Sequence, residues 1–271
     1  MSYFKKMALM LLPLSLFALE MKPWMEQEWE FNLIPSYTFD FYPRVQGGSP
    51  HSQKTTFENI FALNLYTSPS ENWQAELETE FASTTRLPMG YRSVAFQLRN
   101  QLLSDTLGDV CSATWGANVR GVSDRDLTDP SCPYHSNFNA EIGGSIGKEW
   151  SHDEEWKMRT FGFLGAGMAN RGLPWIRFFA SFEANQDEKN RFELFAQGYF
   201  GFGDQDVVHI NNFNGYASIH HQSIDLGAKY SYLLGIWGHI SLGYTRRIYA
   251  HLFPESVNYF VVSYTLPFSF F

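Results

Sequence analysis

The chain has 271 residues, 28 of them acidic and 20 Lys or Arg, which gives a formal net charge of −8 at pH 7. This acidic balance argues against nucleic-acid binding. With 25 Phe, 14 Tyr and 8 Trp, the chain is richer in aromatic side chains than most soluble proteins of this size, yet it has no long apolar run after its first 20 residues. A membrane β-barrel reconciles these two facts, because it needs apolar residues only at alternate positions and carries aromatic girdles at both interfaces.

The start of the chain has the pattern of a secretory signal peptide. Two basic residues, Lys5 and Lys6, precede an apolar run over residues 7–19. The run is shorter than the roughly 20 residues that a membrane-spanning helix needs, which disfavours the alternative of an N-terminal anchor. We predict a leader of 18 residues cleaved after Ala18, and one mature domain over residues 19–271.

The rest of the chain is a series of segments in which apolar and polar residues alternate. Period two is the repeat of a β-strand, whose successive side chains point to opposite faces, whereas a helix repeats near 3.6. The alternation is clearest in residues 28–42, 73–81, 91–102, 176–183 and 223–232. In each segment one face is aromatic and aliphatic, and the other carries polar and charged side chains. We predict barrel strands with the apolar face toward lipid.

Short polar turns alternate with longer links along the chain. The short turns lie at residues 68–72, 151–155, 186–190 and 234–236, and the longer links at 43–53, 170–174, 203–217 and 250–256. Outer-membrane barrels have short periplasmic turns and longer extracellular loops. The pattern therefore predicts antiparallel strands, an even strand number and both termini on the periplasmic side.

Residues 105–136 leave two alternatives open. Eleven strands are clear elsewhere, and a strand over residues 112–122 would make twelve and put every short turn on one side. The other alternative is a loop of about 30 residues closed by a disulfide between Cys111 and Cys132. In the twelve-strand arrangement these cysteines lie at opposite ends of a strand, where a rise of about 3.3 Å per residue keeps them beyond the reach of a disulfide. The alternatives exclude each other, and we favour twelve strands.

The polar faces should line the lumen, which in a twelve-strand barrel is wide enough for a narrow channel. The early strands contribute mainly acidic candidates: Glu30, Asp40, Glu58, Glu76, Glu78 and Glu80. The later strands contribute Arg99, Arg120, Arg177, Lys229 and Arg247, with Glu183, Glu193 and Asp225 among them. An acidic wall facing a more basic one would set up a transverse field that favours polar solutes. The alternative is that the charges pair across the lumen and close it.

One tripeptide suggests a catalytic site. His221, Gln222 and Ser223 resemble the His-Gln-Ser of outer-membrane phospholipase A, a twelve-strand barrel in which the Ser is the nucleophile and the His the base. The Asn-Gly that continues the family's motif is missing here, and Gly235 stands where the family has the Asn of its triad. The alternation also directs His221 and Ser223 toward the lumen, whereas the family's pair faces lipid. We therefore favour polar lumen residues over a hydrolase.

Two further patterns lead us to expect no cofactor. His220 and His221 are adjacent on a strand and so point to opposite faces, which makes them, with His239, a poor metal site. The glycines of residues 162–167 are not followed by a helical pattern that would offer a phosphate-binding N-terminus.

The last fifteen residues form a strand with one very apolar face, made by Phe260, Val262, Tyr264, Leu266 and Phe268. This strand resembles the C-terminal β-signal of bacterial outer-membrane barrels, where alternate apolar residues run to a terminal aromatic that the assembly machinery reads. Phe270 keeps the apolar phase, and the terminal Phe271 is one step out of it, after Pro267. The resemblance implies that the barrel-assembly machinery inserts the protein.

These observations together predict an all-β protein: an antiparallel barrel of twelve strands in a Gram-negative-type outer membrane. We expect a narrow, porin-like diffusion channel without enzymatic activity, whose partners are membrane lipid, the assembly machinery and small polar solutes. The alternatives are a lipid hydrolase that uses His221 and Ser223, and a surface-exposed barrel that serves as an adhesin or antigen.

Overall fold

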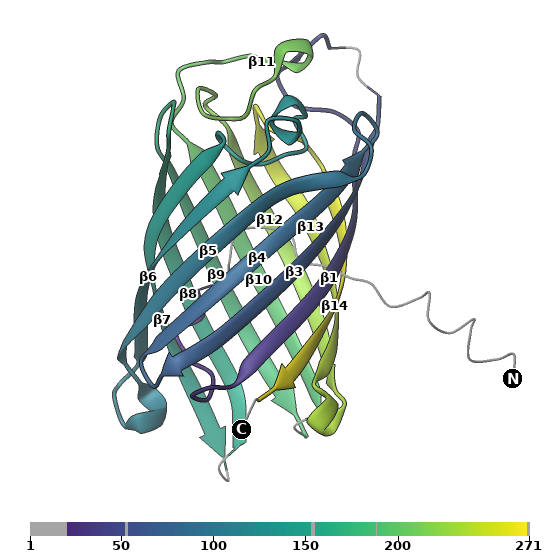
Figure 1. Ribbon diagram of the computed structural model, residues 1–271. Helices are drawn as coiled ribbons and strands as arrows, with labels where there is room; N and C mark the ends of the chain where they lie inside the picture. The colour runs from purple at the N-terminus through teal and green to yellow at the C-terminus, as the bar shows by residue number, and fades with distance from the viewer. Residues whose placement is uncertain (1–20, 52–53, 153–154, 188, 270–271) are drawn as a thin grey trace, which may run out of the picture.

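The computed structural model describes residues 21–51, 54–152, 155–187 and 189–269, in which twelve long antiparallel strands close a barrel (Figure 1). The predicted leader and the two terminal phenylalanines lie outside the described residues. The barrel strands are β1 Phe31–Tyr42, β3 Thr56–Ser70, β4 Trp73–Thr84, β5 Gly90–Leu103, β6 Ser112–Val122, β7 Phe138–His152, β8 Glu155–Ala169, β9 Trp175–Gln186, β10 Asn190–Gly201, β12 Gln222–Leu233, β13 His239–His251 and β14 Asn258–Phe268. The short strands β2 Gly48–Ser49 and β11 Val208–His209 pair with each other in the loops.

Closure of the barrel comes from pairing between the first and last strands. Each barrel strand pairs with its neighbours along the chain, and β1 pairs with β14, where Tyr37 lies opposite Val262. Closure leaves no open sheet edge, which is the condition for a β-structure to span lipid. The apolar face predicted for the C-terminal strand is confirmed, since Phe260 points outward from β14 and Tyr259 is buried on its inner face.

The strand predicted over residues 112–122 is β6, with the same limits, and it makes the strand number twelve. Cys111 precedes this strand, Cys132 lies in the link that follows it, and both are free thiols. The disulfide alternative is therefore wrong. A smaller difference concerns β1, which we expected to begin near Glu28. It begins at Phe31, because Trp29 adopts a left-handed backbone with φ of 61° that cannot continue a strand.

Links of different length separate the two ends of the barrel. The turn end, drawn at the bottom of Figure 1, carries the last residues of β14 and the short links, two of which contain the single turns η1 Asp105–Leu107 and η4 Gly235–Trp237. The loop end carries the long links 123–137 and 202–221, with η2 Asp126–Thr128 and η3 Ile210–Asn212. All four predicted short turns fall at the turn end, and the predicted longer links fall at the loop end.

The outer surface of the barrel is apolar and the interior is polar, the reverse of a soluble protein. Leu194 and Ile142 are examples of outward side chains, 62% and 60% exposed, whereas Asn, Ser, Thr, Glu and Arg side chains are buried inside. A closed belt of exposed aromatic and aliphatic side chains fits the hydrocarbon core of a bilayer. Among the described residues, none of the helical segments has the length or the apolar character that crossing a bilayer would need.

Two parts of the chain fill the barrel from its ends. At the turn end residues 21–26 lie inside the wall, where Lys22 pairs with Glu183 at 2.6 Å and the Trp24 indole donates to Asp105 at 3.1 Å. Met21 packs there among inward-facing phenylalanines of β8 and β9.

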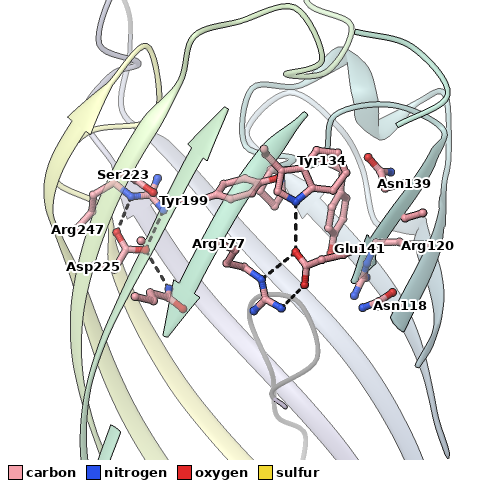
Figure 2. A pocket seen from close by; sticks show the side chains of 15 residues that line it. Asn118, Arg120, Tyr134, Asn139, Glu141, Arg177, Tyr199, Ser223, Asp225 and Arg247 are labelled. Atoms are coloured by element: carbon pink, nitrogen blue, oxygen red, sulfur yellow. Dashed lines mark hydrogen bonds and ion pairs between the residues drawn. The ribbon is translucent and has the colours of Figure 1, made fainter. Parts of the chain in front are cut away.

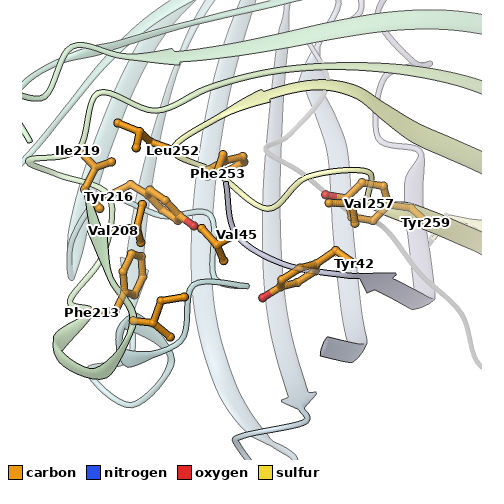
Figure 3. Packing of buried hydrophobic residues seen from close by; sticks show 11 residues of the cluster. Tyr42, Val45, Val208, Phe213, Tyr216, Ile219, Leu252, Phe253, Val257 and Tyr259 are labelled. Carbon is orange, nitrogen blue, oxygen red and sulfur yellow. The ribbon is translucent and has the colours of Figure 1, made fainter. Parts of the chain in front are cut away.

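At the loop end the long links fold together over and into the lumen (Figure 3). Their apolar cluster consists of Tyr42, Val45, Val208, Ile210, Phe213, Tyr216, Ile219, Leu252, Phe253, Val257 and Tyr259. The lumen is therefore narrowed from both sides.

Candidate functional site

The lumen contains cavities in both halves. The cavity in the half near the loop end, the loop-half cavity, holds about 680 Å³ of space, part of it open to solvent. Strands β6, β7, β9, β10, β12 and β13 line it, together with Pro133 and Tyr134 of the link 123–137. The cavity near the turn end, the turn-half cavity, holds about 1310 Å³ and includes Lys22 and Glu26 of the inserted N-terminal segment in its lining.

Two ion pairs face the loop-half cavity (Figure 2). The Arg177 guanidinium donates to Glu141 through Nη2 at 2.6 Å and through Nε at 3.2 Å. The Arg247 guanidinium donates to both oxygens of Asp225, at 2.7 and 3.1 Å. Forked contacts of this kind fix the geometry of both partners, so each pair presents a rigid dipole to the cavity.

The charges of the early strands pair in the same local way. Arg92 of β5 bonds to Glu58 of β3, and Arg120 of β6 bonds to Glu78 and lies 3.3 Å from Glu80, both on β4. The separate acidic and basic walls that we expected from the sequence are therefore not formed. The reason is chain order, because β3, β4, β5 and β6 follow one another around the barrel, and each arginine reaches the acidic strand that lies one strand beyond its neighbour.

The structure places nine of the ten predicted pore-lining side chains on the inner face. The turn-half cavity is lined by Glu76, Glu78, Arg99 and Lys229, and the loop-half cavity by Arg120, Arg177, Asp225 and Arg247, while Glu80 is buried beside Arg120. The tenth, Glu30, lies before β1 and accepts a hydrogen bond from Asn32 at 3.3 Å. Asp40, Glu58, Glu183 and Glu193 are buried on the inner face as well.

Several residues inside the barrel were not predicted from the sequence. Arg92 is the largest fully buried side chain, although simple alternation with Val94 would turn it toward lipid. A β-bulge opposite Glu80 and Phe81 shifts the register, so that Arg92 and Ser93 both point inward. Glu141 could have been found, because it alternates with the exposed Ile142 on β7. The loop residues inside the barrel follow no periodic pattern from which they could have been predicted.

Tyr134 narrows the lumen from the link 123–137. Its hydroxyl donates to Glu80 at 2.7 Å, and the Arg120 guanidinium lies 4.6 Å from its ring centre. Burial raises the pKa of Tyr134 well above its ordinary value, against the opposing effect of Arg120, so the phenol remains a donor at neutral pH. The tip of this link is thus held inside the barrel by contacts with two strands.

His221 and Ser223 do not form the arrangement that a lipid hydrolase needs. The Nε2 atom of His221 lies 3.1 Å from Nε2 of His135, and its ring stacks on Phe253. Ser223 faces the loop-half cavity, and within the described part of the chain no hydrogen bond joins it to His221. Both side chains are inside the barrel, as the alternation predicted. His220 points elsewhere and contacts His251, with ring centres 6.0 Å apart.

No family model and no curated protein matches the sequence. The fold, in contrast, is similar to solved outer-membrane proteins. The COG4313 outer membrane channel from Pseudomonas putida F1 aligns with a TM-score of 0.64 at 9% identity, over 93% of this chain and 100% of that chain. The NanC porin gives 0.57 and the KdgM porin 0.50, each at 8% identity over 87% of this chain and 98% of the other. At these identities the likeness establishes the fold of an outer-membrane barrel.

Proposed function

We propose that the protein is a narrow diffusion channel for small polar solutes in a Gram-negative-type outer membrane. The observation that carries this proposal is the combination of an apolar outer belt with a lumen whose cavities are lined by paired charges. The fold shared with proteins described as channels and porins supports it. The turn end would face the periplasm, in keeping with its short links.

The position of the C-terminal strand also bears on how the barrel assembles. The C-terminal strand β14 is the closing strand, because it pairs with both β13 and β1. A machinery that recognises its outward apolar residues would act on the strand that completes the barrel. The leader of 18 residues would bring the chain across the inner membrane.

Solute selection would take place beside the two ion pairs of the loop-half cavity. Each guanidinium there is neutralised by a carboxylate, so a passing solute meets local dipoles rather than a net charge. Such a field favours polar over apolar solutes and discriminates weakly between cations and anions. The link 123–137 and residues 21–26 would keep the conductance low.

Single-channel recording of the refolded protein in planar bilayers tests the proposal, together with liposome swelling in neutral sugars of increasing mass. We expect small, discrete current steps and uptake limited to small sugars. Arg177→Ala should change conductance and selectivity, whereas the matched variant Ile176→Ala, on the outer face of the same strand, should change neither. A heat-modifiable, folded barrel that passes neither ions nor sugars would refute the proposal.

A further inference from the structure

Two histidines from different links meet inside the loop end of the barrel. His135 belongs to the link 123–137, and His221 ends the link 202–221, just before β12. Their Nε2 atoms are 3.1 Å apart, and the residues are 1% and 0% exposed. The contact therefore joins the inserted link 123–137 to the end of the link 202–221, directly before β12.

Aromatic rings enclose the pair on both sides. His135 stacks on Trp175 of β9 with ring centres 4.1 Å apart, and its Nδ1 lies 2.8 Å from the Tyr199 hydroxyl of β10. His221 stacks on Phe253 at 5.0 Å and meets the edge of Tyr216 at the same distance.

Two glycines make this close packing possible. A Cβ on Gly201 would lie 2.4 Å from Nε2 of His221, and a Cβ on Gly215 would lie 2.3 Å from the carbonyl oxygen of His135. Gly215 also has a positive φ of 79°, which other residues rarely adopt. The backbone is thus shaped around the two imidazoles.

The geometry allows only one proton between the rings. One imidazole must donate and the other accept, because two N–H groups cannot point at each other across 3.1 Å. The second nitrogen of His135 is shared with Tyr199, and the Nδ1 atom of His221 has no hydrogen-bond partner among the described residues. Adding one proton to the neutral pair would bury a positive charge. Adding a second would place two N–H groups opposite each other and break the contact.

The surroundings offer little to balance that charge. Within the described residues no carboxylate is hydrogen-bonded to either imidazole. The carboxylates behind the rings, Glu141 and Asp225, are committed to Arg177 and Arg247. Among the described residues, the other titratable or charged groups near the pair are Tyr199 of β10, Tyr216 of the link 202–221, Cys132 of the link 123–137, and Arg247 of β13, whose guanidinium lies over Phe253. His220 is next to His221 in the chain, but its ring is turned toward His251.

We propose that His135 and His221 form an acid-operated latch, which holds the link 123–137 inside the lumen at neutral pH and releases it in acid. The inference rests on the proposed channel, whose conductance would rise when Pro133 and Tyr134 leave the wall of the loop-half cavity. Neutral imidazoles suit the aromatic enclosure, whereas imidazolium ions are stabilised in water once the link is released.

The direction of the pH effect follows from the two states. Burial lowers the pKa of His135 to about 3, and burial together with His135 and Arg247 lowers the pKa of His221 well below its ordinary value. Once the link 123–137 is released, water reaches both imidazoles, and both should titrate at about pH 6.5. The closed state is therefore fully stable above about pH 6.5 and loses stability as the pH falls toward the closed-state values. Each histidine reduces the closed-to-open ratio about tenfold per pH unit in that window.

The test needs a readout that does not depend on ion flow. Cys132 is a buried free thiol in the same link, and Cys111→Ser leaves it as the single thiol of the chain. We would measure its reaction with 4,4′-dithiodipyridine, a disulfide that thiols attack with release of 4-thiopyridone even in acid, from pH 7.5 to 4.5 alongside single-channel conductance. The reference is Cys111 in a Cys132→Ser background. At pH 5 the accessibility of Cys132 relative to the reference should rise at least about 30-fold, and conductance should rise with it.

His135→Gln and His221→Gln each keep a neutral hydrogen-bonding group and remove one titrating imidazole, so each should halve the pH slope of both responses, and the double variant should flatten them. The matched control is His220→Gln, next in the chain but outside the enclosure, which should respond like the parent. Each variant is first checked for heat-modifiable folding. The test can be made with one glutamine variant if the other does not fold. A pH-independent Cys132 reaction in the parent, or an unchanged acid response in the folded glutamine variants, would overturn the latch. Currents without a Cys132 response would refute the latch and keep the channel, whereas the reverse would keep the latch and refute the channel.

Discussion

Neighbouring residues on the closing strand give a direct test of which side faces lipid. Val262 and Ser263 lie near the middle of β14, Val262 in phase with the exposed Phe260 and Ser263 in the lining of the turn-half cavity. About five residues separate them from either end of the strand. At a rise of about 3.3 Å and a tilt of about 45°, this corresponds to about 12 Å of depth on each side, near the midplane of the apolar band. Val262→Arg should therefore lower the free energy of unfolding by about 2–4 kcal/mol.

The matched variant Ser263→Arg places the same charge into the turn-half cavity, where acidic and basic side chains already face solvent. Its effect should stay within about 0.5 kcal/mol. Reversible guanidinium unfolding in phospholipid vesicles, followed by tryptophan fluorescence, measures both values. The expected difference corresponds to roughly 30- to 1000-fold in the folded-to-unfolded ratio. A larger loss at Ser263 would show that the assignment of the inner and outer faces of β14 is reversed, and equal losses would refute the placement of Val262 alone against lipid.

Three other predictions concern the lumen. Glu78→Gln should destabilise the barrel by about 1–3 kcal/mol in unfolding titrations, because the buried Arg120 guanidinium then has only one carboxylate near it. Glu76→Gln should leave the stability unchanged, and it should shift the permeability toward anions, as measured by reversal potentials. Ser223→Ala should leave conductance unchanged, and a lipid-hydrolase activity that this variant abolishes would favour the hydrolase alternative instead. Deletion of residues 21–26 should raise single-channel conductance, since this segment occupies the lumen at the turn end, and an unchanged conductance would show that it does not limit flow.

The sequence determined which residues face outward, because an antiparallel strand alternates its side chains whatever its partners are. Period two was sufficient to place the apolar belt and the inward Glu76, Arg99 and Arg177. The requirement that short turns share one end then identified β6 within an ambiguous region. Together these arguments predicted the closed barrel of twelve strands, because a barrel in lipid has few ways to satisfy its backbone.

Only the tertiary structure decided how the interior is filled. The bulge that turns Arg92 inward depends on the register between β4 and β5, which alternation within one strand cannot reveal. Contacts between segments far apart in sequence decide that Glu78 pairs with Arg120. They also decide that residues 21–26 and the link 123–137 insert into the barrel. His135 and His221 are separated by 86 positions and come together only because both links fold into the same end of the barrel. Links have no periodic pattern, since packing against the completed wall determines their conformation.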